Sequence, residues 1–397
     1  MSPSAKLFLN VDDPADWSEV FYCDKAADTE HVISSLESPP QSVKFTKKSG
    51  NLGGACKTSF TATDLRNTNV EVTFYVHEGV TPDSWNNIDS VQVGFATSDG
   101  NNLQILMLAD SSDITEPGWY VRGCVPKMES VDVGDYDNLY SACDNARVQF
   151  YAKDADFTPS VTYDRIAVFD ELTTPLYLLF FDDGYAGDFK YAQYLAAKGL
   201  RATFAIIPWR IGQPGWLSIE QLYQMRQMGH CIVNHGYYSL YKVTGNIPDN
   251  EYRKDIYKGY KWLAEKGFGD TCDLFVVPGG SNNWKESWFN TFRTDYIRSI
   301  RLTRTGADWF TSDPRRCWVN VMDSTADAES IRSALSGTGA VGASLFHTIN
   351  EGTDWTEANL KSHIDNLATD HNAGTIKVVT FDEYYNIIRD FYGDYTL

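Results

Sequence analysis

The sequence has no long apolar segment and comparatively few positive charges. No apolar run approaches the roughly eighteen residues that a membrane span needs, so we expect no transmembrane segment. The 34 Lys and Arg are outnumbered by 53 Asp and Glu, which gives a formal net charge of −19. This charge argues against nucleic acid or an anionic membrane as the partner. It fits a protein that faces neutral or cationic material.

Two further patterns are missing. The first residues, MSPSAKLFLNVDDPADW, lack a basic start followed by an apolar core, so we expect no secretory signal there. Either the protein is not exported by that route, or the sequence starts beyond such a segment. The seven Cys, an odd number, show no CxxC or other metal-ligand spacing. One or two disulfides among Cys23, Cys56, Cys124 and Cys143 stay open, although a chain of this size does not need them.

The length and the aromatic content are informative in a different way. With 397 residues the chain is too long for one ordinary hydrophobic core and suits two domains. Aromatic residues make up 14% of it, with 11 Trp and 23 Tyr. Such side chains suit contacts with sugar rings, but they serve equally well in a core. Composition alone therefore leaves the partner open.

Residues 1–170 are dominated by apolar residues that recur with period two. The clearest runs are Val70, Val72, Phe74 and Val76, and then Val91, Val93 and Phe95. Turn clusters such as SDGNN at 98–102 separate the runs, and we expect no helix between them. This pattern predicts an antiparallel β-sandwich. The closing run, VTYDRIAVFDE, resembles the last strand of a concanavalin-like jelly roll, which implies a glycan-binding domain or a packing and assembly domain.

The pattern changes at Glu171–Pro175, and residues 171–397 alternate between strands and helices. Further strands are predicted at 201–207, 230–234, 274–277, 299–302, 319–322, 343–346 and 377–380. Ser218 and Gln221 form a capping box that opens a helix, and apolar faces at 252–263 and 360–367 predict two more. Successive βα units of this number predict a distorted (β/α) barrel of the TIM kind.

The stretch LYLLFFDDGY at 176–185 carries the most distinctive chemistry. An unbroken apolar run is typical of a strand buried on both faces. It ends in Asp182 and Asp183, which places two acids at the carboxyl end of a barrel strand, where barrels keep their active sites. A bound cation would explain two neighbouring negative charges. The alternative is an Asp-Gly turn that happens to follow a core strand.

Two histidines follow other predicted strands at the same rim. His235 lies in the segment NHGYYS, and His347 ends the strand in ASLFHTI. Carboxylate and imidazole together suit zinc or a similar cation. We expect the remaining His residues to be hydrogen-bonded structural side chains, and His363, on a predicted helix, is the clearest case.

The order of these motifs resembles a known family. FFDDG, GHCIVNHGYYS, FVVPGG and SLFHTI follow one another over residues 175–390 as the motifs of polysaccharide deacetylases do, the NodB-homology carbohydrate esterases. The resemblance implies that Asp182 is the catalytic base, that Asp183 and His235 are metal ligands, and that His347 is the general acid. It further implies one divalent metal, Zn²⁺, and an acetylated polysaccharide as substrate. Tyr185 and Tyr237, with Pro278 and Gly279 of the third motif, are implied as substrate-binding residues.

The chain departs from the family pattern at two positions. Ser239 stands where a second metal histidine is expected, and a neutral hydroxyl is a poor zinc ligand, so the metal would be held weakly. Val276 stands where the third motif usually has the Arg that steadies the catalytic acid. We expect Arg301 or Arg304 to supply that charge from the next strand.

Other interpretations stay open. A barrel that has lost full metal binding would be a glycan-binding protein or a structural component of a virion or cell surface, and the substrate class itself suggests an extracellular, cell-surface or virion-associated protein. A glycoside hydrolase would need two carboxylates across a cleft, which adjacent acids do not give. A calcium site at Asp132, Asp135 and Asp137 lacks standard loop spacing. Further candidates for stacking on sugar rings are Trp209, Tyr238, Trp284 and Trp309.

Overall fold

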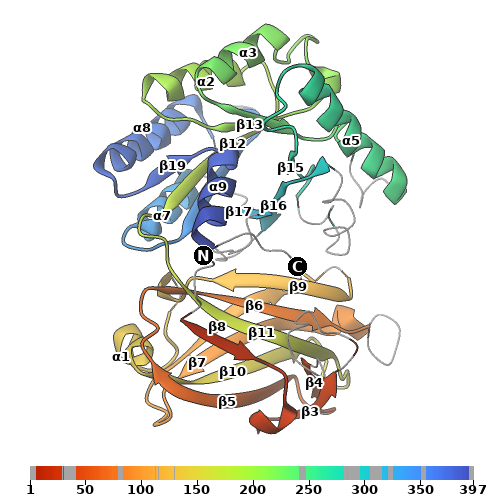
Figure 1. The fold of residues 1–397 in the computed structure, drawn as a ribbon, viewed down its shortest axis with the longest axis vertical. Coiled ribbons are helices and arrows are strands. Elements are labelled where there is room, and N and C mark those ends of the chain that lie inside the picture. Colours follow the sequence, from red (N-terminus) through yellow and green to blue (C-terminus); the bar gives the residue numbers. More distant parts are fainter. Residues whose placement is uncertain are drawn as a thin grey trace. The chain divides into compact units, whose positions relative to one another are not determined.

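A computed structural model describes most of the chain. The described residues are 6–28, 30, 42–78, 84–111, 113–114, 116–128, 130–240, 247–280, 284, 296–304, 315–320, 325–349 and 355–392. The chain divides between Glu171 and Leu172 into two compact units, the N-terminal unit and the C-terminal unit (Figure 1). Each unit has its own fold.

The N-terminal unit consists of antiparallel strands in two sheets. Its elements are β1 (Leu7–Asn10), β2 (Ser18–Phe21), β3 (Cys23–Asp28), β4 (Ser42–Lys47), β5 (Gly53–Thr63), β6 (Thr68–Val76), β7 (Ile88–Ala96), β8 (Leu103–Asp110), β9 (Gly118–Cys124), α1 (Tyr136–Ser141), β10 (Cys143–Ala152) and β11 (Ser160–Asp170). One sheet has the order β3-β4-β11-β6-β9, with β1 also paired to β11, and the other has the order β2-β5-β10-β7-β8. The predicted antiparallel sheets are therefore present.

The core of the N-terminal unit is built from both sheets. Val70, Val72 and Phe74 of β6 and Val91 and Phe95 of β7 all belong to one buried cluster. Side chains alternate across a strand, so the period of two in the sequence places these residues on one face. Burying that face is what specifies the register of each strand.

One expectation for this unit, that no helix interrupts the strands, was wrong. The short helix α1 interrupts the strands, and its N-cap Asp135 accepts a hydrogen bond from the Asn138 amide at 2.9 Å. The Asp132 carboxylate accepts a hydrogen bond from the Ile105 amide at 2.6 Å. Two of the three acids considered for calcium thus satisfy backbone amides. All seven cysteines are buried free thiols in this structure, so no disulfide is present among them.

The C-terminal unit alternates parallel strands with helices. Its strands are β12 (Leu176–Asp183), β13 (Thr203–Ile206), β14 (Cys231–Asn234), β15 (Leu274–Val276), β16 (Ser299–Arg304), β17 (Arg316–Asn320), β18 (Val341–Phe346) and β19 (Lys377–Val379). Its helices are α2 (Asp188–Ala197), α3 (Ile219–Gln227), α5 (Asp249–Glu265), α7 (Thr325–Leu335), α8 (Glu357–Ala373) and α9 (Phe381–Tyr392). In Figure 1 the helices α2, α3, α5 and α8 lie outside the strands.

Most predicted elements of this unit are confirmed. The capping box closes as expected, with the Gln221 amide bonded to Ser218 Oγ and the Ser218 amide bonded to Gln221 Oε1. β17 begins three residues before the predicted strand, and the last two residues of that prediction, 321–322, lie outside the described residues. Within the described part of the chain, no helix is long and apolar enough to cross a membrane.

β12 is the penultimate strand of the parallel sheet, whose order is β17-β16-β15-β14-β13-β12-β18, and β19 also pairs with it. β18 pairs along residues 176–181 of β12, while β13 pairs with 180–183 and β19 with 176–178. β13 and β19 must therefore share the other edge of β12. With neighbours on both edges and helices outside, all eight residues of β12 are buried, as the apolar run predicts.

The sheet is strongly curved. β12 and β16 are four strand steps apart, which would separate them by roughly 19 Å in a flat sheet at about 4.8 Å per step. Arg301 of β16 nevertheless reaches Asp182 of β12, with Nη2 and Oδ2 2.5 Å apart. The strands must therefore curl around a common interior. No ladder joins β17 to β18 among the described residues, so the expected barrel closure is not established.

Candidate active site

The two acids of the FFDDG motif end β12 in different backbone conformations. Asp182 is 2% exposed and Asp183 is 9% exposed. Successive side chains of a strand point to opposite faces, yet both carboxylates lie near one imidazole, that of His235. Asp183 has a φ of +75°, in the left-handed region that non-glycine residues seldom adopt. At Asp183 the backbone therefore leaves strand geometry, and the alternation of side chains between the two faces of β12 ends. This allows both carboxylates to lie near His235.

Asp182 forms a buried ion pair with Arg301. The Arg301 side chain is 1% exposed, and its Nη2 donates to Asp182 Oδ2 at 2.5 Å. Asp182 Oδ1, Arg301 Nε and Arg301 Nη1 are buried with no hydrogen-bond partner in the described part of the chain. Buried polar groups are normally satisfied. Asp182 and Arg301 thus both keep buried hydrogen-bonding atoms that no other described residue uses, as is expected where a ligand binds.

His235 directs one ring nitrogen at the two acids. Its Nδ1 donates to the Val276 carbonyl at 2.8 Å, which leaves Nε2 with a lone pair in the neutral ring. Nε2 lies 3.5 Å from Asp183 Oδ1 and 4.0 Å from Asp182 Oδ2. Burial lowers the pKa of His235, although both carboxylates act in the opposite direction. A neutral ring that presents its lone pair to carboxylates is repulsive unless a cation lies between them.

The loop after β14 is fixed by helix α5. The Tyr238 amide donates to Asp255 Oδ1 at 2.8 Å, and the Tyr237 amide donates to the Asp255 carbonyl at 3.2 Å. Gly236 has a φ of +75°, and a Cβ there would lie 2.6 Å from Asp255 Oδ2, so glycine is required. Ser239 is buried with a φ of +56°, and its Oγ has no hydrogen-bond partner among the described residues.

His347 is less closely tied to these groups. Phe181 of β12 lies opposite Phe346 of β18 in the ladder, so His347 follows the position beside Asp182. Its side chain is exposed and makes no hydrogen bond within the described residues. The structure thus brings Asp182, Asp183, His235 and Arg301 together, and it leaves His347 at the edge of an adjacent cavity.

The other predicted residues fall into four groups. Pro278 is buried and Gly279 is exposed, directly after β15. Trp209 and Tyr238 are 54% and 44% exposed, and their rings are 5.5 Å apart at the centroids, so they remain available for stacking. Trp284 is wrong as a stacking candidate because it is buried in a core cluster. Trp309 and the Arg304 side chain lie outside the described residues.

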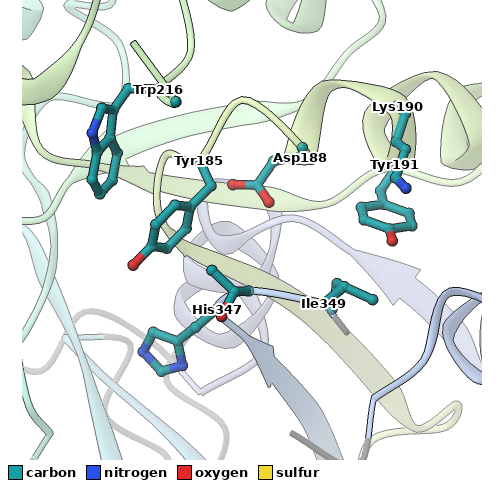
Figure 2. A pocket seen from close by; sticks show the side chains of 10 residues that line it. Tyr185, Asp188, Lys190, Tyr191, Trp216, His347 and Ile349 are labelled. Atoms are coloured by element: carbon teal, nitrogen blue, oxygen red, sulfur yellow. The ribbon is translucent and has the colours of Figure 1, made fainter. Parts of the chain in front are cut away.

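A cavity of about 360 Å³ opens at the ends of β12 and β18 (Figure 2). Among its lining residues are Tyr185 and His347, which the sequence predicts, and Asp188, Tyr191 and Trp216, which it does not. Asp188 occurs in the first turn of α2, where an acid is ordinarily explained by the helix dipole. No sequence signal distinguishes such a residue from one that lines a cavity.

The site offers an incomplete set of metal ligands. No group of three or more His, Cys, Asp or Glu is arranged to hold a metal ion in the described part of the chain. Asp183 and His235 nevertheless supply a carboxylate oxygen and an unprotonated nitrogen 3.5 Å apart, and Ser239 Oγ is buried without a partner. These donors fit a divalent cation that completes its shell with water or substrate. They fit it weakly, because zinc sites usually have three or four strong protein ligands.

Comparison with protein families bears directly on this geometry. Residues 170–289 match the model of the family described as polysaccharide deacetylase. This segment is a polysaccharide deacetylase domain. It holds the two acids of β12, His235 and the third motif, whereas Arg301 and His347 lie beyond it. The match identifies residues 170–289 as a carbohydrate deacetylase domain, of the hydrolase class.

Several solved structures show a weaker likeness to this chain. A family 4 acetyl xylan esterase from Clostridium thermocellum, with a cobalt ion, is 19% identical over 53% of this chain and 91% of its own, with a TM-score of 0.37. The peptidoglycan deacetylase PdaC from Bacillus subtilis is 16% identical over 55% and 93%, with a TM-score of 0.35. No curated protein matches the chain. Likeness at these scores says nothing about substrate or mechanism.

Proposed function

We propose that the C-terminal unit is a metal-dependent deacetylase that removes acetyl groups from a glycan, either an N-acetylhexosamine polymer or an O-acetylated polysaccharide. The observation that carries the proposal is the buried cluster that residues of β12, β16 and the segment after β14 form together. There Arg301 holds Asp182, and the unprotonated nitrogen of His235 faces both acids. A structural role would not call for two carboxylates and a bare imidazole nitrogen around one point.

In this proposal Asp182 acts as the general base that takes a proton from the attacking water. Its Oδ2 is held by Arg301, so the unpartnered Oδ1 is the oxygen available to accept that proton. Asp183 and His235, with Ser239 as a weak third ligand, would hold one divalent metal ion, Zn²⁺. When bound, such an ion polarises the acetyl carbonyl and lowers the pKa of a nearby water.

His347 is proposed as the general acid that protonates the departing amine or hydroxyl. Its support is its place at the end of β18, in register beside the end of β12, and its exposure to the cavity. Tyr185, Tyr237, Pro278 and Gly279 are proposed as contacts to the substrate. The products are acetate and a free amine or hydroxyl on the glycan.

The same proposal includes the finer features of the fold, the role of the N-terminal unit and the location of the protein. These are a closed, distorted (β/α) barrel over residues 171–397, a jelly-roll-like sandwich over 1–170 that binds glycan or serves assembly, and an extracellular, cell-surface or virion-associated location. The incomplete ligand set supports one alternative, a glycan-binding or structural protein without catalysis.

The test is metal content followed by acetate release. Protein dialysed against zinc and then against buffer should retain about one ion per chain, and Asp183→Ala should retain none. Acetate release from acetylated chitin, peptidoglycan and xylan fragments should fall at least about 100-fold in Asp182→Asn, in which the base is lost. Asp270→Asn, a surface acid paired with Arg226, is the matched control. Glycan binding without metal or acetate release would support the alternative instead.

A further inference from the structure

Two of the buried cysteines lie where the two sheets of the N-terminal unit meet at one edge. β2 pairs with β5 in one sheet, and β3 pairs with β4 in the other, so the chain crosses between the sheets at Tyr22. Tyr22 has a φ of +43°, a left-handed conformation that fits a sharp corner. Cys23 begins β3 directly after this corner, and Cys56 lies on β5, the partner of β2.

The pairing of β2 with β5 places this corner next to Cys56. Glu19 of β2 is the ladder partner of Cys56, and its Oε1 accepts a hydrogen bond from the Cys23 amide at 3.3 Å. Gly54 is on the same face of β5 as Cys56, because it is two residues away. A Cβ at Gly54 would lie 3.4 Å from Cys23 Cβ and 3.0 Å from the Tyr22 carbonyl oxygen. β5 thus carries no side chain at the position where the corner approaches it.

The two thiols are in direct contact. Cys23 is 3% exposed and Cys56 is fully buried, and both belong to the core cluster of the unit. The Cys23 thiol has two acceptors, the Asp24 carbonyl at 3.5 Å and the sulfur of Cys56. Both cysteines are reduced in this structure. Sulfurs that hydrogen-bond directly, on strands this close, need only a small movement to meet the geometry of a disulfide.

The surroundings make Cys56 the more reactive of the two thiols. The hydrogen bond from Cys23 lowers the pKa of Cys56, and Lys25 and Lys48 add to this effect, against burial and Glu19. The same hydrogen bond, followed by burial, raises the pKa of Cys23. Because the thiolate is the nucleophile in cysteine chemistry, we expect Cys56 to react first while Cys23 keeps its proton.

A surface ion pair borders the two thiols on the solvent side. Lys48 Nζ lies 2.8 Å from Glu19 Oε1, and the two side chains are 37% and 43% exposed. The Lys48 amide donates to the Tyr22 carbonyl at 2.9 Å, so the pair lies at the corner that carries Cys23. Exposed ion pairs of this kind are weak. A small oxidant can therefore reach the sulfurs when the pair opens, whereas a bulky one is kept out.

We propose that Cys23 and Cys56 form a reversible disulfide that links the two sheets of the N-terminal unit, with hydrogen peroxide as the oxidant. The Cys56 thiolate attacks one peroxide oxygen, the O–O bond breaks, and Cys56 sulfenic acid and hydroxide form. The Cys23 sulfur then attacks the sulfenic sulfur, so that the S–S bond forms and the S–O bond breaks. The protons of the two thiols convert both hydroxides to water. Two thiols and one peroxide thus give one disulfide and two waters.

The disulfide would stabilise the N-terminal unit in oxidising surroundings. It closes a loop of about 34 residues, and such a link restricts the unfolded chain. Disulfides persist in oxidising compartments and are rare where thiols are kept reduced. The inference concerns the N-terminal unit alone, and it does not depend on the proposed deacetylase reaction.

The first test needs no variant. The full-length parent protein is treated with an equimolar amount of hydrogen peroxide, and the remaining thiols are alkylated before digestion. Mass spectrometry should find a linked peptide pair that holds Cys23 and Cys56, and dithiothreitol should separate it. The unfolding temperature of the N-terminal unit should rise by roughly 5–15 °C on oxidation. The absence of this linked pair, or linkage mainly between other cysteines, would overturn the proposal.

The order of the two steps is tested with single variants and dimedone, a reagent that labels sulfenic acids. In Cys23→Ser, where the hydroxyl still donates to Cys56, the sulfenic acid should persist at Cys56 and be labelled. In Cys56→Ser, labelling of Cys23 should be at least about tenfold lower. Cys143→Ser is the matched control, since it removes another buried thiol, whose pKa burial raises to about 12, and it should form the disulfide as the parent protein does. Equal labelling of the first two variants would overturn the assignment of Cys56 as the attacking thiol.

Discussion

Asp182 lies on β12, Arg301 on β16 and His235 directly after β14, and their meeting explains the chemistry open to each. Arg301 occupies one carboxylate oxygen of Asp182 and leaves the other unpartnered. The Val276 carbonyl fixes the His235 ring so that its bare nitrogen faces the acids. At the scale of single residues, the site is thus a set of oriented groups, in which Arg301 holds Asp182 and a backbone carbonyl holds His235.

Arg301→Ala should impair both stability and catalysis. Breaking a buried ion pair by removing one partner typically costs about 3–5 kcal/mol. Loss of a well-placed general base should also lower acetate release by about 100-fold or more. Thermal unfolding and acetate release are the two measurements.

Arg226→Ala serves as the control for that prediction. Its pair with Asp270 is largely exposed, and such pairs contribute no more than about 1 kcal/mol. Full acetate release by Arg301→Ala would show that Asp182 needs no partner, and the assignment of Arg301 as its positioning residue would then be wrong.

Ser239→His should strengthen metal binding. Ser239 follows His235 by four residues, and its Oγ is buried without a partner, so the new ring would replace the weakest donor of the proposed set. Changes around a metal site commonly alter affinity by roughly 10–100-fold, and a new imidazole ligand should gain at least tenfold. Competition with a zinc chelator measures the gain. Equal affinity in the parent protein and variant would place Ser239 away from the metal.

At the scale of elements, α5 positions the end of β14. The Asn234 side chain donates to the Ile256 carbonyl of α5 at 2.9 Å, and its oxygen accepts from the Gly236 amide at 2.9 Å. Asp255, one residue before Ile256, holds the amides that follow. One turn of one helix therefore fixes the whole segment between His235 and Leu240.

Gly259→Ala in α5 should destabilise the C-terminal unit. Helix propensity alone favours alanine by about 1 kcal/mol. A Cβ at Gly259 would, however, lie 2.1 Å from Asn234 Oδ1, so the side chain that pins β14 must move. Overpacking of this kind costs about 1–3 kcal/mol, which thermal unfolding would detect.

Gly269→Ala is the matched control because no atom lies within 4 Å of the added Cβ. If Gly259→Ala raised the unfolding temperature, helix propensity would outweigh the Asn234 contact, and α5 would not position the loop in the way described.

At the scale of the whole molecule, the spacing of apolar residues along the sequence predicted the architecture, because that spacing reflects which faces of the strands are buried. The alternating valines of β6 and the apolar run of β12 both lie where their patterns place them. For the partner of Asp182, the sequence predicted either Arg301 or Arg304 and could not decide between them. The decision depends on how strongly the sheet curves, which the sequence does not reveal. Asp188 gave no signal at all, since its place in a cavity depends on β18 and on the segment at Trp216.

The pH dependence of folding stability should reveal a buried neutral histidine. Burial lowers the pKa of His230 to about 4, despite its hydrogen bond to the Ala192 carbonyl, and nearby Arg201 acts in the same direction as burial. Its Nδ1 accepts from the Ala202 amide at 3.1 Å, so protonation would set two donors against each other. In the unfolded chain the group titrates near its ordinary value of about 6.5.

Between these two values the unfolded state binds more protons, so stability falls as the pH drops from about 6.5 to 4, by roughly 3 kcal/mol in total. Glu329, whose pKa is lowered to about 2 by His363 and Arg332 against the effect of burial, adds losses only below about 4.5. Urea unfolding at pH 7, 6 and 5 should therefore give a shallower decline in His230→Gln than in the parent protein. Equal slopes would show that His230 does not resist protonation, and that the acid sensitivity of the fold arises at other groups.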